Sequence, residues 1–406
     1  MIREYTSDCV HCGFCLPTCP TYVLWREEMD SPRGRIHLMD ARLDGTIALN
    51  TTVAQHFDRC LGCMACVSSC PSGVRYDRLI EATRAAVEDE LERPLGDRLV
   101  RGVLFRLLPH PGRMRAALRI APLGRRAPLP KRFRPLAEIA PRWRGHGEVP
   151  AVTPPQGPRR ARVGLLTGCV QSAVFPDVNA ATARVLAADG FEVVAPQQGC
   201  CGALSVHAGR LDEGKAFARR LIDAFDDVDL VVVNTSGCGS HLKEVGWLLE
   251  DERAESFAAK VRDVGELLGD ATPRAARHPL PMTVALQDSC HLRHAQRLPL
   301  SSRVALARIP ALEVVEPAEQ DLCCGSAGIY NVVQAEAARE LGDRKARHVL
   351  ATGAQAYASA NPGCLVQVSA ALHRAEQPLP ALHPIELVDA SVRNVGAGRL
   401  LASARR

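Results

Sequence analysis

The sequence predicts an α+β chain of several domains, in which a helical N-terminal domain precedes a duplicated α/β domain with parallel sheets. Three observations lead to this prediction. Two cysteine runs with the same spacing lie among segments suited to helices, strands alternate with helices from Arg162 onward, and the second half repeats the first. The expected domains are residues 1–92, a connector over 93–160, a first repeat over 161–278 and a second repeat over 279–406.

The first element is the pair of cysteine runs. The first reads Cys9-Val-His-Cys12-Gly-Phe-Cys15-Leu-Pro-Thr-Cys19-Pro20, and the second places Cys60, Cys63, Cys66, Cys70 and Pro71 in the same frame. This C-x2-C-x2-C-x3-C-P spacing binds [4Fe-4S] clusters, and the fourth cysteine normally binds the cluster of the other run. A structural zinc site instead uses four ligands in closed C-x2-C pairs. We therefore expect two [4Fe-4S] clusters, with these ligands: Cys9, Cys12, Cys15 and Cys70 for the first, and Cys60, Cys63, Cys66 and Cys19 for the second.

The segments around the two runs favour helices. Residues 32–44 and 52–59 suit helices, and an amphipathic segment over 77–93 is stopped by Pro94. A helical ferredoxin-like domain is therefore expected, in place of the compact, strand-rich ferredoxin.

The connector is strongly basic. Residues 93–162 contain 17 Arg or Lys and three acidic residues, whereas the whole chain has a net charge of only +5. The first interpretation is a solvated, Pro- and Gly-rich linker. The alternative is a surface that docks on a partner subunit or on anionic lipid through short basic amphipathic helices at 103–108 and 114–120. Nucleic acid is not expected, because no stacking aromatic residues accompany the charge.

The second half contains two copies of one strand–helix pattern. The first copy has strands at 163–168, 191–195 and 229–234, a helix capped by Asn179 and closed by Gly190, and a helix at 213–225. The second copy has strands at 283–288, 312–315 and 356–360 and helices at 302–309 and 335–350. Alternating strands and helices predict parallel sheets.

Each copy carries four further cysteines, and three of its loops supply them. They are Cys169, Cys200, Cys201 and Cys238 in the first copy and Cys290, Cys323, Cys324 and Cys364 in the second. Sites in parallel α/β folds gather at the carboxyl ends of strands, where these loops lie. Gly202 and Gly325 are expected to relieve crowding between adjacent thiols, and the following helix N-termini to lower thiol pKa values.

The occupant of these second sites stays open from the residues alone. An iron–sulfur cluster, zinc and a redox-active thiol pair are all compatible with the pattern, and buried structural cysteines are the simplest alternative. Nearby histidines are interpreted as ordinary loop residues and not as ligands: His207, His241, His291 and His294.

Several classes of function are not indicated. The chain has no run of eighteen apolar residues and no apolar segment before Cys9, so neither a membrane span nor a secretory signal is expected. Sixteen cysteines without such a signal suit the reducing cytoplasm. We find no G-x-G-x-x-G after a strand, no phosphate-binding loop and no general-base constellation, so no catalytic residue is assigned.

Taken together, these motifs resemble the iron–sulfur subunits of bacterial glycolate oxidase. The resemblance spans nearly the whole chain and rests on these segments: 9–22, 31–36, 58–66, 70–76, Gly199–Gly202, Thr235–Gly239, Leu322–Gly328 and Asn361–Cys364. It implies a heterotrimer-like complex in which two flavin-type subunits carry FAD and oxidise glycolate, and also D-lactate. This chain would pass the electrons to a quinone or another respiratory acceptor, with peripheral contact at the cytoplasmic face of the inner membrane.

Other readings of the same residues remain. Related families include electron-transfer subunits of glycerol-3-phosphate and lactate dehydrogenases, and heterodisulfide reductases, which act on disulfides at doubled Cys-Cys-Gly sites. A scaffold with zinc in the repeats is a third reading. The heterodisulfide reductases use an extra thiolate in each repeat, whereas this chain has His241 and Gln367 at those positions. That difference argues against their non-cubane cluster chemistry here.

Overall fold

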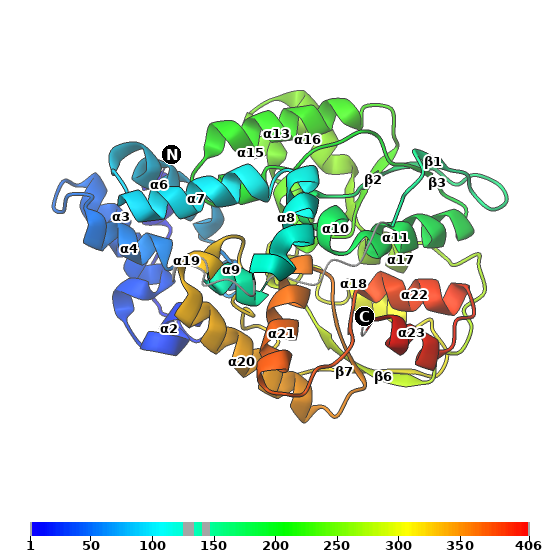
Figure 1. Cartoon of the computed structure of the whole chain (residues 1–406). Coiled ribbons are helices and arrows are strands. Elements are labelled where there is room, and N and C mark those ends of the chain that lie inside the picture. The colour runs from blue at the N-terminus through cyan, green and yellow to red at the C-terminus, as the bar shows by residue number, and fades with distance from the viewer. Residues whose placement is uncertain (1, 125–133, 140–146, 405–406) are drawn as a thin grey trace.

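The computed structural model describes residues 2–124, 134–139 and 147–404. The N-terminal domain lies at one end of the molecule, and the two α/β repeats lie side by side at the other (Figure 1). The connector helices α7 and α8 run between them (Figure 1). Connector residues 125–133 and 140–146 lie outside the described part.

The N-terminal domain is helical, as predicted. Its elements are α1 (Ile2–Ser7), α2 (Pro20–Trp25), the 3-10 helix η1 (Glu28–Asp30), α3 (Pro32–Leu43), α4 (Thr51–Asp58), α5 (Ala65–Ser68) and α6 (Tyr76–Glu90). The Ser31 hydroxyl accepts a hydrogen bond from Gly34 N and the Asn50 side chain accepts one from Val53 N, so each polar residue caps the helix that follows it. The fully buried side chains of Phe57, Leu79 and Ile80 form the core of this domain.

The connector is a structured part of the fold wherever it is described, so the linker interpretation is wrong for residues 95–124. It forms α7 (Leu95–Leu107), α8 (Pro111–Gly124) and α9 (Arg134–Ile139). One apolar face of α7 and α8 packs inward through Val100, Leu104, Phe105, Met114 and Leu118. Burial of such side chains stabilises each by roughly 1.5–3 kcal/mol, which holds the helices against the repeats.

The first repeat is built on a five-stranded sheet with the order β1-β3-β2-β4-β5, in which only β1 is antiparallel. Its strands are β1 (Val152–Thr153), β2 (Arg162–Leu166), β3 (Glu192–Val194), β4 (Leu230–Val233) and β5 (Val261–Asp263). Its helices are α10 (Cys169–Val174), α11 (Pro176–Ala188), α12 (Ala203–Val206), α13 (Leu211–Ala224), α14 (Ser236–Lys243), α15 (Val245–Leu249), α16 (Glu252–Lys260) and α17 (Val264–Asp270).

The second repeat has a parallel four-stranded sheet with the order β7-β6-β8-β9. Its strands are β6 (Met282–Gln287), β7 (Leu312–Val315), β8 (Ala356–Ser359) and β9 (Ala381–Leu382). Its helical elements are the π-helix η3 (His291–Ala295), α18 (Ser301–Leu306), α19 (Tyr330–Val333), α20 (Ala335–Ala351), α21 (Pro362–Arg374), α22 (Pro384–Val392) and α23 (Ala397–Ala404). The first strand of each copy, β2 or β6, lies between the second and third, so the predicted duplication is confirmed.

The two repeats share one core. Val163 and Leu165 of β2 are fully buried in the same apolar cluster as Val284 and Leu286 of β6. The helices α11 and α22 pack on each other across the boundary, as do α17 and α18. No helix in the described ranges is both long and apolar enough to cross a membrane.

One predicted helix start is wrong. The helix α11 begins at Pro176, whose fixed φ suits the first helical turn, and not after Asn179. Asn179 is buried within this helix, where its Nδ2 donates to Thr167 O at 2.8 Å and its Oδ1 accepts from Asn234 Nδ2 at 2.8 Å. This asparagine therefore joins the carboxyl ends of β2 and β4.

Candidate iron–sulfur centres and the cavity between the cysteine repeats

The two N-terminal cysteine loops have the same unusual backbone. His11 and Gly62, two residues after the first cysteine of each run, have φ values of 51° and 63°. Gly13 and Met64, which directly follow the second cysteine, have φ values of 87° and 61°. Left-handed residues at these two positions bend each loop around a central point, and non-glycine residues adopt this conformation only where the surroundings hold them there.

The last cysteine of each run lies near thiols of the other run. Burial raises the pKa of Cys9, and the nearby Cys70 raises it further, although Cys70 belongs to the other run. A small cavity is lined by Cys9, Cys12, Cys15 and Cys70, and also by Cys66. Burial also raises the pKa of Cys66, and its thiol neighbours include Cys63, Cys60 and Cys19. The structure thus gathers the sulfur donors of both runs, a chemistry that suits iron–sulfur clusters.

The second centre is surrounded by positive charge and hydrogen-bond donors. Burial opposes ionisation of Cys60, yet Arg35 and Arg84 lower the pKa of its thiol below the usual value. Gly62 N donates to Cys60 Sγ at 3.4 Å and the Tyr76 hydroxyl donates to it at 3.8 Å. Donors and positive charge near ligand sulfur atoms raise the reduction potential of a cluster.

The segment Ser31–Arg35 brings one of these charges to the centre. A Cβ on Gly34 would lie 1.9 Å from Glu28 O, so only glycine fits between α3 and η1. This close approach places the Arg35 side chain, only 1% exposed, against Asp30 at 3.6 Å and against His56 O at 2.6 Å. Because removal of one partner of a buried ion pair costs about 3–5 kcal/mol, Arg35 has a structural as well as an electrostatic role.

All eight cysteines of the repeats line one cavity of about 840 Å³: Cys169, Cys200, Cys201, Cys238, Cys290, Cys323, Cys324 and Cys364. Cys60 of the N-terminal domain lines it as well. The Sγ atoms of Cys169 and Cys200 are 3.4 Å apart, and those of Cys290 and Cys323 are 4.0 Å apart. The cysteines of both copies are therefore gathered at one place.

Direct contacts between the carboxyl ends of the two sheets create this arrangement. Ser289 Oγ, after β6, donates to Ser236 Oγ, after β4, at 2.6 Å. The fully buried His383 lies before α22, and its Nε2 donates to Asn234 O at 2.9 Å. Parallel strands direct their loops to one edge of each sheet, and these contacts hold the two edges face to face.

A matched pair of glutamines holds the loops in both repeats. Gln198 Oε1 accepts from Thr167 N at 2.9 Å and its Nε2 donates to Leu165 O at 3.0 Å. In the second repeat, Gln320 Oε1 accepts from Asp288 N at 3.1 Å and its Nε2 donates to Leu286 O at 2.7 Å. Each glutamine thus fixes the loop that carries the cysteine pair to the end of the first strand of its repeat.

The glycine after each cysteine pair has a different role from the one expected. Gly202 and Gly325 have φ values of 95° and 88°. A Cβ on either would lie 2.6 Å from a carbonyl oxygen of the following long helix, Gly214 O or Ala338 O. These glycines let the loop contact that helix closely, so their role is more than to relieve crowding between thiols.

The thiol pKa values differ from the helix-terminus expectation. Cys169 is the first residue of α10, yet its hydrogen bond with Cys200 and its burial raise its pKa well above the usual value. Hydrogen bonds with neighbouring thiols lower the pKa of Cys200 and of Cys324 well below it. Hydrogen bonds between neighbouring thiols are thus the largest cause of these pKa shifts.

Histidines attach the N-terminal domain to the repeats, a role that the sequence did not suggest. His291 Nε2 donates to Gly62 O at 2.9 Å, and its Nδ1 accepts from Ser240 Oγ at 2.7 Å. His207 Nδ1 donates to a carboxylate oxygen of Glu81 at 2.8 Å. Both histidines follow repeat cysteines closely, which is the only sequence signal for this role.

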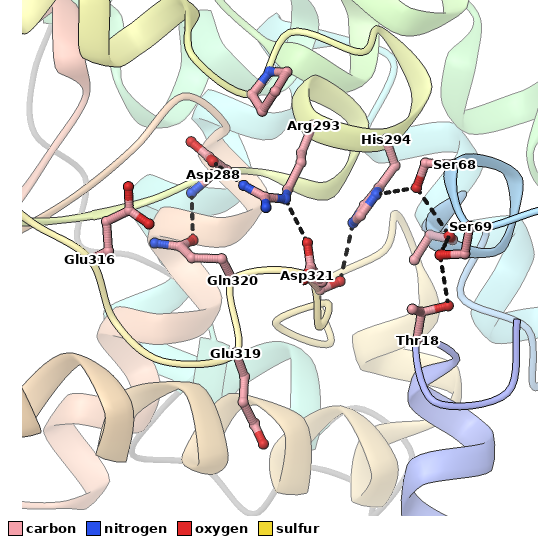
Figure 2. A network of polar contacts seen from close by, with 12 residues as sticks. Thr18, Ser68, Ser69, Asp288, Arg293, His294, Glu316, Glu319, Gln320 and Asp321 are labelled. Atoms are coloured by element: carbon pink, nitrogen blue, oxygen red, sulfur yellow. Dashed lines mark hydrogen bonds and ion pairs between the residues drawn. The ribbon is translucent and has the colours of Figure 1, made fainter. Parts of the chain in front are cut away.

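His294 makes a further link at the same interface. It lies between Ser68 and Asp321: its Nδ1 accepts from Ser68 Oγ at 2.6 Å and its Nε2 donates to Asp321 O at 3.2 Å (Figure 2). Arg293 extends the network to Asp288 at the end of β6 (Figure 2). The loop of the second cysteine run is therefore fixed to two of the three cysteine loops of the second repeat.

The second cysteine run packs directly on the second repeat. Cys63 lies in one apolar cluster with Cys323 and Cys290. Burial raises the pKa of Cys63 well above its usual value, and among the nearby thiols Cys290 raises it most. In contrast, Cys169 and Cys200 of the first repeat pack against Phe217 in a separate cluster. The two repeats are thus inequivalent with respect to the N-terminal domain.

His241 and Gln367, at the positions where heterodisulfide reductases carry extra thiolates, lie in different environments. Gln367 Nε2 donates to Ala338 O at 2.7 Å, so this side chain is hydrogen-bonded to the backbone of α20. His241 is 5% exposed, and burial lowers its pKa to about 4. Within the described ranges, no group of three or more His, Cys, Asp or Glu side chains is arranged to hold a single metal ion.

Comparisons with known proteins agree with this geometry. Residues 5–74 match a family described as a 4Fe-4S dicluster domain, and residues 163–243 and 284–369 each match a cysteine-rich domain. A probable glycolate oxidase iron-sulfur subunit from Bacillus subtilis is 38% identical over 395 residues, which cover 90% of this chain and 89% of that protein. The glycolate oxidase iron-sulfur subunit of Escherichia coli is 36% identical over 382 residues, covering 89% of each.

A solved structure supports the overall architecture. The crystal structure of a hypothetical protein from Helicobacter pylori matches with a TM-score of 0.55 and covers 91% of this chain and 69% of that chain. Its sequence identity is 9%, so this likeness concerns the fold alone.

Proposed function

The chain belongs to the family of glycolate oxidase iron–sulfur subunits, and we propose on that premise that it carries electrons from a 2-hydroxy-acid-oxidising flavoenzyme to a respiratory acceptor. Glycolate is the proposed substrate, with D-lactate as a second one. The observation that carries the proposal is the contact between Cys63 of the N-terminal domain and Cys290 and Cys323 of the second repeat.

We assign the N-terminal thiols to two [4Fe-4S] clusters. The first set is Cys9, Cys12, Cys15 and Cys70, and the second is Cys60, Cys63, Cys66 and Cys19. Their support is the mixed grouping of the two runs, which places Cys70 near Cys9 and Cys19 near Cys66. When bound, these clusters supply centres that accept and release one electron at a time.

The repeat cysteines are assigned to further iron–sulfur centres, one for each copy. The support is the presence of four thiols in each repeat and the low pKa of Cys200 and Cys324, since thiolates and not thiols bind metal. Arg84 donates to His207 O, and His291 donates to Gly62 O. These two bonds hold the second cysteine run against the cavity. The protein thereby maintains a fixed separation between its redox groups.

Two flavin-type subunits are the proposed partners, because this chain has no residue assigned to hydride or proton abstraction. A quinone is the proposed acceptor. We also propose peripheral contact with the cytoplasmic face of the inner membrane. Leu95, Leu99 and Val103 lie one turn apart on the outer side of α7 and are 82%, 60% and 37% exposed. Exposed Arg98 and Arg106 lie on the same helix, so this surface combines apolar and basic groups.

The test is anaerobic reconstitution. The isolated chain should be brown, show cluster signals in electron paramagnetic resonance (EPR) after reduction, and oxidise no glycolate until the flavin subunits are added. Iron and acid-labile sulfide counts of roughly eight would mean that only the N-terminal sites are filled, and higher counts would place clusters in the repeats. Glycolate oxidation by the flavin-free chain would contradict the proposed division of labour.

A further inference from the structure

The cavity between the repeats has two chemically different walls. One wall carries the repeat cysteines and Cys60. The other part of the lining is aliphatic, and the connector helices supply most of it: Leu104, Leu107, Leu108, Met114, Leu118 and Ile120. The iron–sulfur centres proposed for the repeat cysteines would occupy the thiol-lined part of this cavity, so the aliphatic part calls for another occupant. The volume of about 840 Å³ includes the space of those centres, and small-molecule sites measure about 300–1,000 Å³.

Buried polar groups without partners lie in the lining of this cavity. Gln171 is 1% exposed and Tyr330 is 4% exposed. Within the described part of the chain, neither the amide group of Gln171 nor the hydroxyl of Tyr330 has a hydrogen-bond partner. The same holds for His207 Nε2, whose ring is oriented by Glu81. An unsatisfied buried polar group costs about 1–3 kcal/mol, so three of them around one cavity indicate a ligand with matching oxygen atoms.

The position of Tyr330 connects this polar set to the redox groups. Burial raises the pKa of its hydroxyl above the usual value, and the nearby thiols of Cys60 and Cys323 raise it further. Tyr330 also packs in the apolar cluster that contains Cys63 and Cys323. A ligand oxygen bound by this hydroxyl would therefore lie beside the contact between the second cysteine run and the second repeat.

We propose that this cavity binds the electron acceptor and that the acceptor is a quinone. The inference rests on the proposed function and adds a location to it. A quinone has two carbonyl oxygens for the Tyr330 hydroxyl and the Gln171 amide, and an apolar tail for the aliphatic wall. Ile120 lines the cavity and is 64% exposed, so this wall reaches the molecular surface.

The chemistry balances with the proposed 2-hydroxy-acid substrates. Oxidation of a 2-hydroxy acid to a 2-oxo acid releases two electrons and two protons. Reduction of the quinone takes up two electrons and two protons, and both carbonyl groups become hydroxyl groups. A soluble protein acceptor would instead dock on the surface and would not enter an internal aliphatic cavity.

The test uses the complex reconstituted with its flavin subunits, and Ala117→Trp as the variant. Ala117 lines the cavity, whereas Ala116 on the same helix is exposed and does not. A117W should raise the KM for ubiquinone-1 at least tenfold while glycolate:ferricyanide activity stays unchanged. The matched control A116W should leave both activities at the wild-type level.

A second variant keeps the proposal testable if A117W fails to fold. Tyr330→Phe removes a hydroxyl without a protein partner, so the melting temperature should not fall. The KM for ubiquinone-1 should rise roughly three- to tenfold, the value of one hydrogen bond. Equilibrium binding of ubiquinone-1 should weaken by the same factor, which separates this role from a structural one.

The outcomes separate the two proposals. Wild-type KM values for ubiquinone-1 in folded A117W and in Y330F would overturn the quinone site and leave the electron-transfer function intact. Failure of the wild-type complex to reduce either ubiquinone-1 or ferricyanide with glycolate would instead contradict the proposed function, whereas quinone binding would still be measurable directly.

Discussion

His291 donates a hydrogen bond from Nε2 to the carbonyl oxygen of Gly62, 2.9 Å away. Gly62 lies inside the second cysteine run, and His291 directly follows Cys290 of the second repeat. This bond therefore joins two candidate redox loops that are separated by more than two hundred residues in the sequence. Together with the bond between His294 and Ser68, it holds Cys63 in the apolar cluster of Cys290 and Cys323.

Loss of this bond should weaken the interface between the domains. We expect His291→Ala to lower the free energy of unfolding by about 1–2 kcal/mol, because Gly62 O and Ser240 Oγ both lose a partner. Electron transfer should slow while the N-terminal iron content stays unchanged, as measured by rapid-freeze EPR and iron assay. His348→Ala is the control, since His348 lies on the surface beside Glu319. An unchanged transfer rate in H291A would show that the bond does not matter for transfer.

The exchange of cysteines between the two runs can be tested by paired substitutions. We expect Cys19→Ser and Cys66→Ser to remove the same EPR signal, because both thiols belong to the second set. Cys70→Ser and Cys9→Ser should remove the other signal. If C19S and C9S remove one signal together, each run binds its own cluster and the proposed exchange is wrong.

The glycine after the first cysteine pair should tolerate no side chain. Gly202→Ala places a Cβ 2.6 Å from Gly214 O at a φ of 95°, which should cost at least about 2 kcal/mol of stability and reduce iron binding in the first repeat. Gly199→Ala is the matched control, because no atom lies within 4 Å of its Cβ and a change within about 0.5 kcal/mol is expected. Equal melting temperatures for the two variants would refute this packing role.

Acid should destabilise the contact between the repeats through His383. Burial lowers the pKa of this histidine from 6.5 to about 3. Below pH 6.5 the unfolded chain binds a proton at this residue and the folded chain does not, so stability falls as the pH falls toward 3. Each pH unit costs about 1.4 kcal/mol.

The measurement compares the wild type with His383→Asn in anaerobic urea unfolding. Asparagine can still cap α22 but carries no titrating group, so the stability advantage of the wild type should shrink by about 2 kcal/mol between pH 7 and pH 5. A constant difference over this range would mean that His383 takes up a proton in the folded state.

The outer surface of α7 should determine membrane contact. Leu99→Glu introduces a charge at a leucine that is 60% exposed and should lower binding to phosphatidylglycerol vesicles at least tenfold in a sedimentation assay. Leu300→Glu is the control at a leucine that is 62% exposed elsewhere on the surface. Equal binding of L99E and wild type would remove the membrane role of this helix.

The predicted elements and the observed ones agree best where local patterns dominate. The strand at 163–168 and the helix at 335–350 were found as β2 and α20, because apolar runs and helical periodicity are local properties. The predicted start of α11 is wrong because Pro176 competes with Asn179 as a start signal. Asn179 instead accepts a hydrogen bond from Asn234, which directly follows β4. The linker interpretation of the connector is wrong because its apolar residues become buried only when its helices pack against the repeats.

The sequence by itself indicated which cysteines are the candidate sulfur ligands, since the spacing of a cysteine run is a property of one short loop. It also determined the duplicated strand–helix order and membership of an electron-transfer family. Only the tertiary structure decided that both sets of repeat cysteines share one cavity with Cys60, and that the second cysteine run packs against the cysteines of the second repeat. The physical reason is that such juxtapositions depend on contacts between distant segments, such as His291 with Gly62 and Ser289 with Ser236, which leave no periodic or local pattern.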